Sequence, residues 1–129
     1  MPYSSRHLES LLRTYLKSFP VVGLTGPRQS GKSTLLQHTL GKEYQYVSFD
    51  EQDVIDRFYD DPKRFIDTYN DKTIFDEAQK VPELFGYIKR AVDKDRQNYG
   101  KFVISGSSQF SLVEKITESL AGRIGLLTL

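Results

Sequence analysis

An apolar segment near the start of the chain leads directly into a glycine-rich loop. The segment is PVVGLT at residues 20–25, and the loop is GPRQSGKST from Gly26 to Thr34. A short, continuous apolar run of this kind is typical of a strand that is covered on both faces of a sheet. A helix is predicted to follow from Lys32 to Leu40, where Gly41 ends it. A strand, a glycine loop and a helix in this order indicate an α/β fold with a parallel sheet.

Predicted strands and helices alternate along the rest of the chain. Further strands are predicted at residues 44–49, 72–76, 101–105 and 124–129. Helices are predicted at residues 4–18, in two short pieces around Asp61-Pro62, from Pro82 onward, and after GSSQF to about Leu120. The strand at residues 44–49 alternates polar and apolar residues, so we expect it to lie at an edge of the sheet. Together these elements predict an α/β fold with a mostly parallel, five-stranded sheet.

The composition fits one globular domain and excludes several classes of site. The chain has 129 residues, enough for a single core, and no cysteine, which excludes disulfides and zinc sites with cysteine ligands. Its 18 basic and 17 acidic residues balance, so the composition gives no clear nucleic-acid signal, that is, no basic excess that would indicate nucleic-acid binding. The balance does not exclude a local basic patch. No apolar leader begins the chain, and no apolar stretch approaches the roughly 20 residues of a membrane helix. We therefore expect a cytoplasmic protein without membrane contact.

The loop fits the pattern G-x-x-x-x-G-K-[ST] from Gly26 to Ser33. Successive backbone N–H groups of such a loop surround a phosphate, and the N-terminus of the following helix adds its dipole. Lys32 is expected to reach the β- and γ-phosphates and to act in catalysis, while the Ser33 hydroxyl ligates Mg²⁺. The expected nucleotide contacts in the loop are Gly26, Pro27, Arg28, Gln29, Ser30, Gly31, Lys32, Ser33 and Thr34. The alternative is a chance glycine turn, but the match lies between a predicted strand and a predicted helix, as a phosphate loop requires.

Two adjacent carboxylates, Asp76 and Glu77, follow the predicted strand at residues 72–76. Because the carboxyl ends of parallel strands meet at one edge of a sheet, both acids are expected to face the same crevice as the phosphate loop. Asp76 would hold Mg²⁺ directly or through water, and Glu77 would orient and polarise an attacking water. The alternative is that both acids cap the next helix. The upstream phosphate loop favours the first interpretation, and Glu77 favours hydrolysis over phosphoryl transfer to a metabolite.

Two serines and two arginines are further candidates for residues of the nucleotide site. Ser107 and Ser108 follow the fourth predicted strand, where one of them would contact the γ-phosphate or the attacking water; the alternative is a helix cap. Arg123 precedes the fifth predicted strand, where an arginine finger would emerge toward the γ-phosphate of a neighbouring subunit. The alternatives for Arg123 are an intrachain ion pair or a solvated side chain. Arg28 could contact phosphate, pair with an acid or face a partner.

Several motifs occur along the chain in an order that resembles one protein family. They are GPRQSGKSTLL, Ser48-Phe49-Asp50, Asp61-Pro62 with Phe65, IFDEAQKVPELFGYIKRAVD, FVISGSSQFSL and LAGR. Over essentially the whole chain, they resemble the ATP-binding domain of bacterial and archaeal AAA-type P-loop ATPases that often precedes a DUF4143 domain. This set of motifs is much more specific than the phosphate loop alone.

The resemblance implies an AAA-like P-loop ATPase core that uses ATP and Mg²⁺. The implied fold has three layers, with helices on both faces of a sheet of order 5-1-4-3-2. The implied Walker A residues are Gly26, Gly31, Lys32 and Ser33, the Walker B residues are Asp76 and Glu77, and the sensor residues are Ser107 and Ser108. The family often has Thr in place of Ser33, which keeps the hydroxyl, and Ile in place of Ala78, which leaves the acids intact.

Similar proteins continue past the fifth strand into a helical lid and a DUF4143 domain. We therefore expect residues 1–129 to be the AAA-like ATP-binding core of a larger ATPase, without the lid. The leading functional expectation is Mg²⁺-dependent ATP hydrolysis. The alternatives are a nucleotide-gated interaction module with negligible hydrolysis and a P-loop small-molecule kinase. ATP is the expected partner, a homo-oligomer is compatible with the resemblance, and no protein partner is identified.

Overall fold

The computed structural model describes residues 5–27, 31–107 and 110–128, which form an alternating series of strands and helices. In chain order the elements are α1 (Ser5–Ser18), β1 (Val21–Gly26), α2 (Lys32–Leu40), β2 (Gln45–Ser48), α3 (Gln52–Asp60), α4 (Pro62–Thr68), β3 (Thr73–Asp76), the 3-10 helix η1 (Ala78–Lys80), α5 (Leu84–Asp93), β4 (Phe102–Ser107), α6 (Phe110–Leu120) and β5 (Ile124–Thr128). Apart from η1, which was not predicted, this order of elements agrees with the prediction from the sequence. Among the described residues, no helix is long and apolar enough to cross a bilayer.

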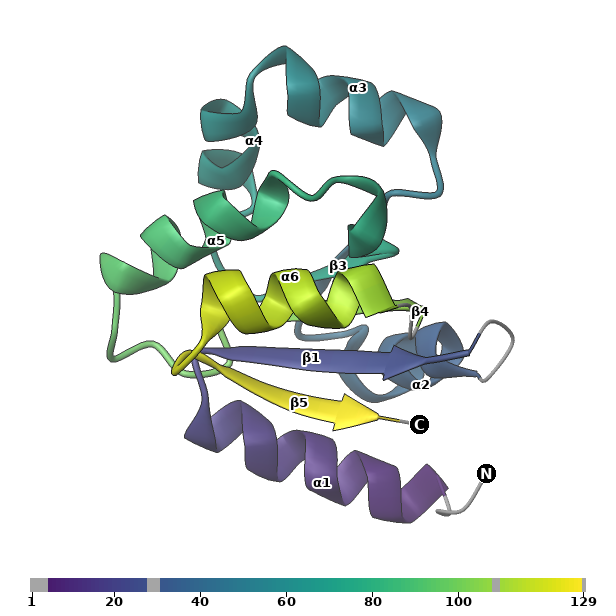
Figure 1. Cartoon of the computed structure of the whole chain (residues 1–129). Helices are drawn as coiled ribbons and strands as arrows, with labels where there is room; N and C mark the ends of the chain where they lie inside the picture. Colours follow the sequence, from purple (N-terminus) through teal and green to yellow (C-terminus); the bar gives the residue numbers. More distant parts are fainter. Residues whose placement is uncertain (1–4, 28–30, 108–109, 129) are drawn as a thin grey trace.

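The five strands form one sheet in the order β2-β3-β4-β1-β5, and every pair of neighbours is parallel (Figure 1). This confirms the predicted α/β fold, its strand order and the edge position of β2. The register pairs Val21 of β1 with Phe102 of β4 and with Ile124 of β5. The carboxyl ends of the strands therefore meet at one edge of the sheet, where β1 ends at Gly26 and β3 ends at Asp76.

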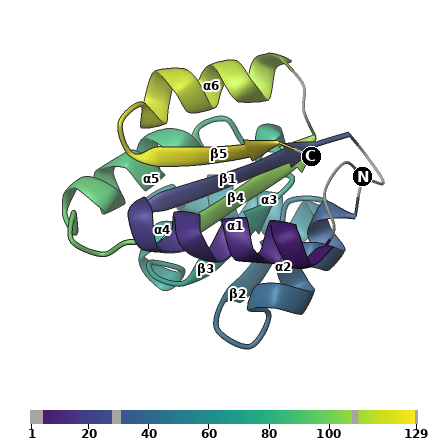
Figure 2. The ribbon, with the colours of Figure 1, turned by 90° about the horizontal axis from the view of Figure 1, so that it is seen from below.

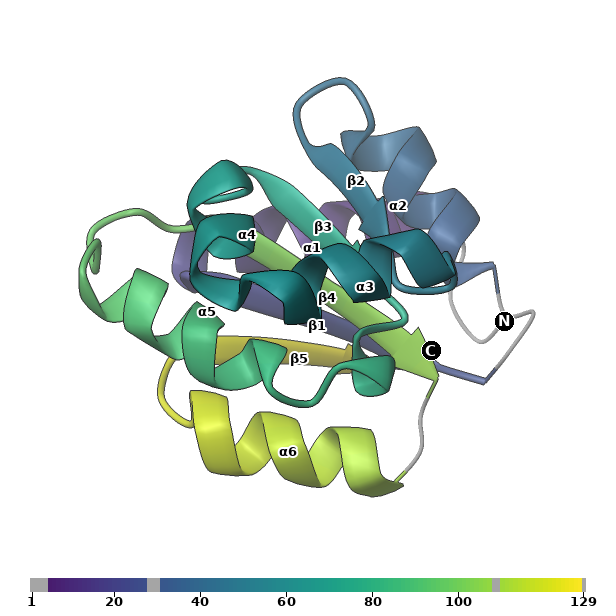
Figure 3. The same cartoon turned by 90° about the horizontal axis from the view of Figure 1, so that it is seen from above.

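Helices cover both faces of the sheet. From below, α1 and α2 lie across one face (Figure 2), and from above, α3, α4, α5 and α6 lie across the other (Figure 3). The core on the first face includes Leu12, Val22, Leu24, Leu36, Leu40, Ile74 and Val103. The core on the second face includes Phe58, Phe65, Phe75, Phe85, Ile88, Phe102 and Ile104. Successive strand residues alternate between the two cores, which is why the central strands are apolar throughout.

Aromatic side chains anchor the carboxyl end of β3. Phe75 is fully buried directly before Asp76, and its ring centroid lies 6.1 Å from that of Phe49 and 5.7 Å from that of Phe102. Phe65 of α4 adds a further contact, with its ring centroid 6.3 Å from that of Phe75. Aromatic pairs of this kind contribute about 0.5–1.5 kcal/mol beyond the burial of their area. The backbone that carries Asp76 is therefore held firmly by the core beneath it.

Several element boundaries differ from the prediction by one or two residues, and the shifts at α5 and β4 are the largest. Helix α5 begins at Leu84 rather than at Pro82. The N–H of Leu84 donates to the carbonyl of Val81 at 2.9 Å, which makes a tight turn before regular α-helix starts. Strand β4 continues to Ser107, two residues past its predicted end, because its pairing with β1 runs on to Gly26.

Candidate functional site

The glycine loop joins β1 to α2 at the carboxyl edge of the sheet (Figure 1). Gly26 ends β1, and Lys32 is the first residue of α2. Gly31, the residue before α2, has a φ of 83°, a left-handed conformation that glycine adopts without steric cost. Pro27 and Thr34 are both exposed. The predicted contacts Arg28, Gln29 and Ser30 lie outside the described residues.

The carboxylate of Asp76, at the end of β3, accepts hydrogen bonds from several elements. Ser33 Oγ of α2 donates to Asp76 Oδ2 at 2.7 Å, and the Tyr46 hydroxyl of β2 donates to the same oxygen. Ser105 Oγ of β4 donates to Asp76 Oδ1 at 2.6 Å, and the backbone N–H of Glu77 donates to Oδ1 at 2.9 Å. Asp76 is only 2% exposed, so these bonds supply the polar contacts that water would otherwise make.

Burial and hydrogen bonding act in opposite directions on the pKa of Asp76. Burial raises this pKa, because a low-dielectric environment disfavours the charged form. The hydrogen bonds lower it, led by the bond from Ser105, and they prevail, so the pKa of Asp76 lies below its ordinary value. For Tyr46, burial and the hydrogen bond to Asp76 act together and raise the pKa to about 12. At neutral pH, Asp76 is therefore ionised and Tyr46 is neutral.

Lys32 and Glu77 form an ion pair that is almost entirely removed from solvent. Lys32 Nζ lies 3.7 Å from Glu77 Oε1, and the two side chains are 6% and 9% exposed. Gln79 Nε2 donates to the other carboxylate oxygen, Glu77 Oε2, at 2.7 Å. Glu77 also has a backbone φ of 55°, which is uncommon outside glycine. Strained backbone of this kind clusters at functional sites, where the surrounding structure holds it in place.

The helix-capping role considered for the two acids has no counterpart in the structure. Glu77 occupies the position before η1, but its side chain makes no capping hydrogen bond. The backbone N–H that bonds to Asp76 belongs to the next residue, Glu77, and not to η1. The side chains that contact the two carboxylates instead belong to α2, to the neighbouring strands β2 and β4, and to Gln79 of η1.

Ser33 and Asp76 together have the chemistry of a Mg²⁺ site. Their hydroxyl and carboxylate oxygens lie 2.7 Å apart. Mg²⁺ requires oxygen ligands and is commonly held by one or two protein groups, with phosphate and water oxygens filling the other positions. Within the described part of the chain, no cluster of three or more His, Cys, Asp or Glu side chains could hold a metal ion alone. The donor set thus fits an ion that is shared with a bound phosphate.

Ser107 lies beside the start of the loop, while the contact with Asp76 comes from a different serine. Ser107 pairs with Gly26 in the sheet and is 7% exposed. The other predicted sensor, Ser108, lies outside the described residues. Ser105, which was not among the predicted site residues, is fully buried and is the serine of β4 that bonds to Asp76.

Strand register explains why Ser105 and Tyr46 were missed. Phe75 of β3 is paired with Ile104 of β4, so the next residues along, Asp76 and Ser105, also become neighbours. Tyr46 lies on the edge strand β2, and its hydroxyl reaches Asp76 on the neighbouring strand β3. The only signal in the sequence was that Tyr46 and Ser105 are polar residues within predicted strands. Ser105 is fully buried and therefore requires a polar partner, whereas Tyr46 is 37% exposed, so the burial argument does not extend to it.

Arg123 lies at the opposite edge of the sheet from the glycine loop. Its carbonyl accepts a hydrogen bond of 3.2 Å from Val21 N–H, at the start of β1. Its guanidinium binds the carboxylate of Asp93, at the end of α5, through bonds of 2.7 and 3.1 Å. This contact lowers the pKa of Asp93. The intrachain ion pair considered as an alternative is therefore present, and Arg123 is not part of the loop site of its own chain.

Comparison with protein families gives one match over most of the chain. A family model described as an AAA domain, AAA_14, matches residues 18–129. The chain is 38% identical over 125 residues to an uncharacterised protein of Mycobacterium bovis and to one of Mycobacterium tuberculosis. Each match covers 96% of this chain and 28% of the relative, so the chain spans little more than a quarter of the length of these relatives.

Solved structures share the fold at low sequence identity. A Walker-type ATPase of Pyrococcus abyssi has a TM-score of 0.66 and 20% identity, and the match covers 98% of this chain and 53% of that one. A DNA replication initiation factor has a TM-score of 0.54 and 12% identity, with 95% of this chain and 44% of that chain covered. At these identities the likeness establishes the fold, a P-loop α/β architecture.

Proposed function

The chain belongs to the AAA domain family, and on this premise we propose that it binds ATP with Mg²⁺ and hydrolyses it. The proposal rests on one arrangement at the carboxyl edge of the sheet. There Ser33 contacts Asp76, and Lys32 contacts Glu77. The first contact joins the two groups that would hold the ion, and the second joins the groups that would bind phosphate and orient water. We propose residues 1–129 as a single AAA-like core domain.

Phosphate binding is assigned to the loop and to Lys32. The backbone of a phosphate loop and the N-terminus of α2 offer N–H groups to an anion. Lys32 Nζ lies inside the site, held there by the carboxylate of Glu77. The γ-phosphate competes with Glu77 for this ammonium, so binding of ATP would separate the Lys32–Glu77 pair. Lys32 then neutralises phosphate charge, and Glu77 becomes available for another partner.

The ion is assigned to Ser33 and Asp76. Bound Mg²⁺ would supply charge neutralisation on the β- and γ-phosphate oxygens. Ser105 and Tyr46 donate to Asp76 and fix the direction in which its oxygens point. Partners of this kind hold a ligating carboxylate in position and tune its affinity for the metal. Tyr46 and Ser105 are thus positioning residues that act through Asp76.

Water activation is assigned to Glu77. Once the Lys32 ammonium has moved to the phosphate, the Glu77 carboxylate can accept a proton from a water aligned with the γ-phosphate. Gln79 still donates to Glu77 Oε2, which leaves Oε1 free to face that water. In this way, ATP binding breaks the Lys32–Glu77 ion pair and frees Glu77 to act as the general base.

The remaining assignments rest on the sequence pattern. Ser107 is proposed to sense the γ-phosphate, since it lies next to Gly26. Arg123 is proposed to act on a neighbouring subunit, which requires that it leave Asp93. The other proposed nucleotide contacts are Pro27, Arg28, Gln29, Ser30, Thr34 and Ser108.

Two substitutions test the proposal. In Lys32→Ala, ATP binding should fall below detection in calorimetric titration, because the phosphate loses its main cation. In Glu77→Gln, ATP affinity should stay within about twofold of the parent, while phosphate release falls by about 10²- to 10⁴-fold, the usual contribution of a general base. Exposed residues of the same types, in Lys17→Ala and Glu51→Gln, serve as matched controls that should change neither measurement.

The outcomes separate the candidate functions. If Glu77→Gln released phosphate at the parent rate, the role given to Glu77 would be wrong. If the parent bound ATP without releasing phosphate, the chain would be a nucleotide-gated interaction module instead. A circular dichroism spectrum of each variant excludes loss of fold as the cause, which matters for Lys32→Ala because it leaves Glu77 buried without its cation.

A further inference from the structure

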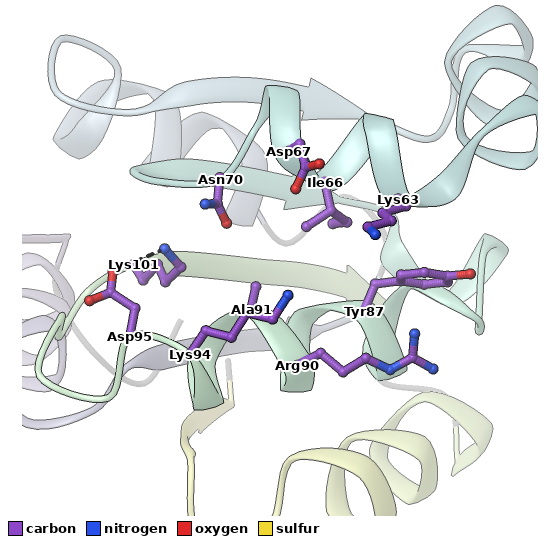
Figure 4. A pocket seen from close by; sticks show the side chains of 10 residues that line it. All are labelled: Lys63, Ile66, Asp67, Asn70, Tyr87, Arg90, Ala91, Lys94, Asp95 and Lys101. Carbon is purple, nitrogen blue, oxygen red and sulfur yellow. Dashed lines mark hydrogen bonds and ion pairs between the residues drawn. The ribbon is translucent and has the colours of Figure 1, made fainter.

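A cavity of about 400 Å³ lies between α4 and α5, away from the glycine loop (Figure 4). One of its lining residues, Lys101, directly precedes β4. The cavity therefore extends toward the amino edge of the sheet, opposite to the edge where Asp76 lies. Its volume falls within the range of about 300–1,000 Å³ that is usual for small-molecule sites. Nothing in the proposed ATPase chemistry uses it.

The cavity has an excess of positive charge. Four cationic side chains line it, against the two carboxylates of Asp67 and Asp95. Lys101 is already paired, because its Nζ lies 3.3 Å from Asp95 Oδ2. The other three, Lys63, Arg90 and Lys94, form no ion pair with any acid in the described part of the chain.

These cations come from two facing helices. Figure 4 shows Lys63 of α4 pointing toward α5, and Lys94, which directly follows α5, pointing toward α4. Arg90 lies against the ring of Tyr87, with Cζ 4.9 Å from the ring centroid, in a cation–π contact. Ile66 adds an apolar wall beside them. A ligand in this space would meet positive charge from both sides and an apolar surface between.

We propose that this cavity binds a small organic anion that carries phosphate or carboxylate groups. Lys63 and Lys94 contact its charged groups from opposite sides, and Arg90 offers a planar set of donors that suits either group. The apolar part of the ligand lies against Ile66 and the ring of Tyr87. The binding energy comes mainly from charges that have no carboxylate partner within the described residues, and which therefore need not give up an existing ion pair.

The surroundings of the cavity favour a small ligand over an extended polyanion. A second hollow, on α3 and α4, is lined by Asp60, Asp61, Arg57 and Arg64, so α3 and α4 carry charges of both signs outside the cavity. A nucleic-acid backbone that left the cavity would soon meet carboxylates. The overall formal charge of +1 likewise gives no chain-wide basic excess.

The test uses the δ1-methyl NMR signal of Ile66, assigned by its loss in Ile66→Val. Phenyl phosphate and phenylacetate are titrated separately into the Lys32→Ala protein, in which the loop no longer competes for anions. We expect the Ile66 signal to shift saturably, while that of Ile116 in α6, outside the cavity, stays unchanged. The two titrations show whether phosphate or carboxylate is preferred.

Charge removal completes the test. The double variant Lys63→Gln/Lys94→Gln should weaken the binding of the better anion at least tenfold. The matched control is Arg64→Gln/Lys89→Gln, which removes two positive charges from the same two helices at positions outside the cavity and should bind within about twofold of the parent.

Three results would overturn the proposal: no shift of Ile66 with either anion, equal weakening in both double variants, or tighter binding of a single-stranded oligonucleotide than of either anion. None of these results depends on ATP binding at the loop. Failure here is therefore distinguishable from failure of the ATPase proposal.

Discussion

Asp76 is held by three side chains that are distant from it in the sequence. Ser33, Tyr46 and Ser105 all donate to its carboxylate, which is nearly fully buried. With several donors, we expect the orientation of the carboxylate to survive the loss of any one of them. The pKa of Asp76 is more sensitive to the loss of a single donor, because each hydrogen bond separately favours the ionised carboxylate.

The first prediction concerns the bond from Ser105, which has the largest lowering effect on the pKa of Asp76. In Ser105→Ala, the pKa of Asp76 should rise, and the free energy of unfolding at pH 7 should fall by about 2 kcal/mol, as expected for a buried hydrogen bond to a charged group. A lowered pKa stabilises the fold above the unfolded-state pKa of about 3.9, and this contribution is lost as the pH falls through the folded-state value. The difference between variant and parent should therefore shrink below about pH 4.

Urea unfolding at pH 7 and at pH 3 measures this difference. Ser18→Ala is a suitable control, because the Ser18 hydroxyl bonds to the carbonyl of Thr14 at an exposed site far from Asp76. An equal loss of stability at both pH values would show that Ser105 contributes through packing and not through the charge of Asp76.

At the scale of elements, α4 shows how local sequence starts a helix. Pro62 is its first residue, a position where the missing N–H costs nothing. The Asp61 carboxylate accepts a hydrogen bond of 3.2 Å from the backbone N–H of Arg64. This short helix then places Phe65 against Phe75 in the core and Lys63 at the cavity.

The second prediction is that Asp61→Ala lowers the free energy of unfolding by about 1 kcal/mol, the usual cost of losing an N-cap. Asp60→Ala removes the same charge one residue earlier, at the last position of α3, and should change the stability by less than about 0.5 kcal/mol. Chemical denaturation of both variants gives the comparison. Similar losses in the two proteins would assign the effect to charge and not to capping.

Element types and order could be predicted because their signals are local. Apolar runs, helical periodicity and the residues Gly41 and Pro62 are all visible without the fold. The two largest boundary differences have causes outside these local signals. The end of β4 was set by its pairing with β1 as far as Ser107, and the start of α5 by the turn that precedes Leu84.

At the scale of the whole molecule, α1 is attached to the sheet through a close contact with β5. Residues 5–17 of α1 lie before the region that matches the AAA domain family, yet Leu12 is buried against the sheet. At Gly125 of β5, an added Cβ would lie 2.8 Å from Cδ2 of Tyr15 and would overlap the ring of Phe19. The absence of a side chain at Gly125 therefore determines how closely α1 can approach β5.

The third prediction follows from this contact. Gly125→Ala should lower the free energy of unfolding by about 1–3 kcal/mol, the usual cost of overpacking. Gly86→Ala, in α5, places its Cβ in open space and should be neutral or stabilising by up to about 1 kcal/mol, as glycine is unfavourable within helices. The midpoint of thermal unfolding should therefore fall in Gly125→Ala and stay equal or rise in Gly86→Ala. Destabilisation of both by the same amount would contradict the role given to Gly125.

The sequence by itself determined the α/β class, the phosphate loop between β1 and α2, and the acids at the end of β3, because each depends on residues that are neighbours in the chain. The tertiary structure decided which side chains meet there. Ser105 and Tyr46 reach Asp76 only through the register of separate strands, and the same carboxyl edge brings Lys32 to Glu77. The cavity between α4 and α5 likewise exists only once both helices pack on the sheet. Such contacts are fixed by the packing of distant segments, which no local pattern of residues contains.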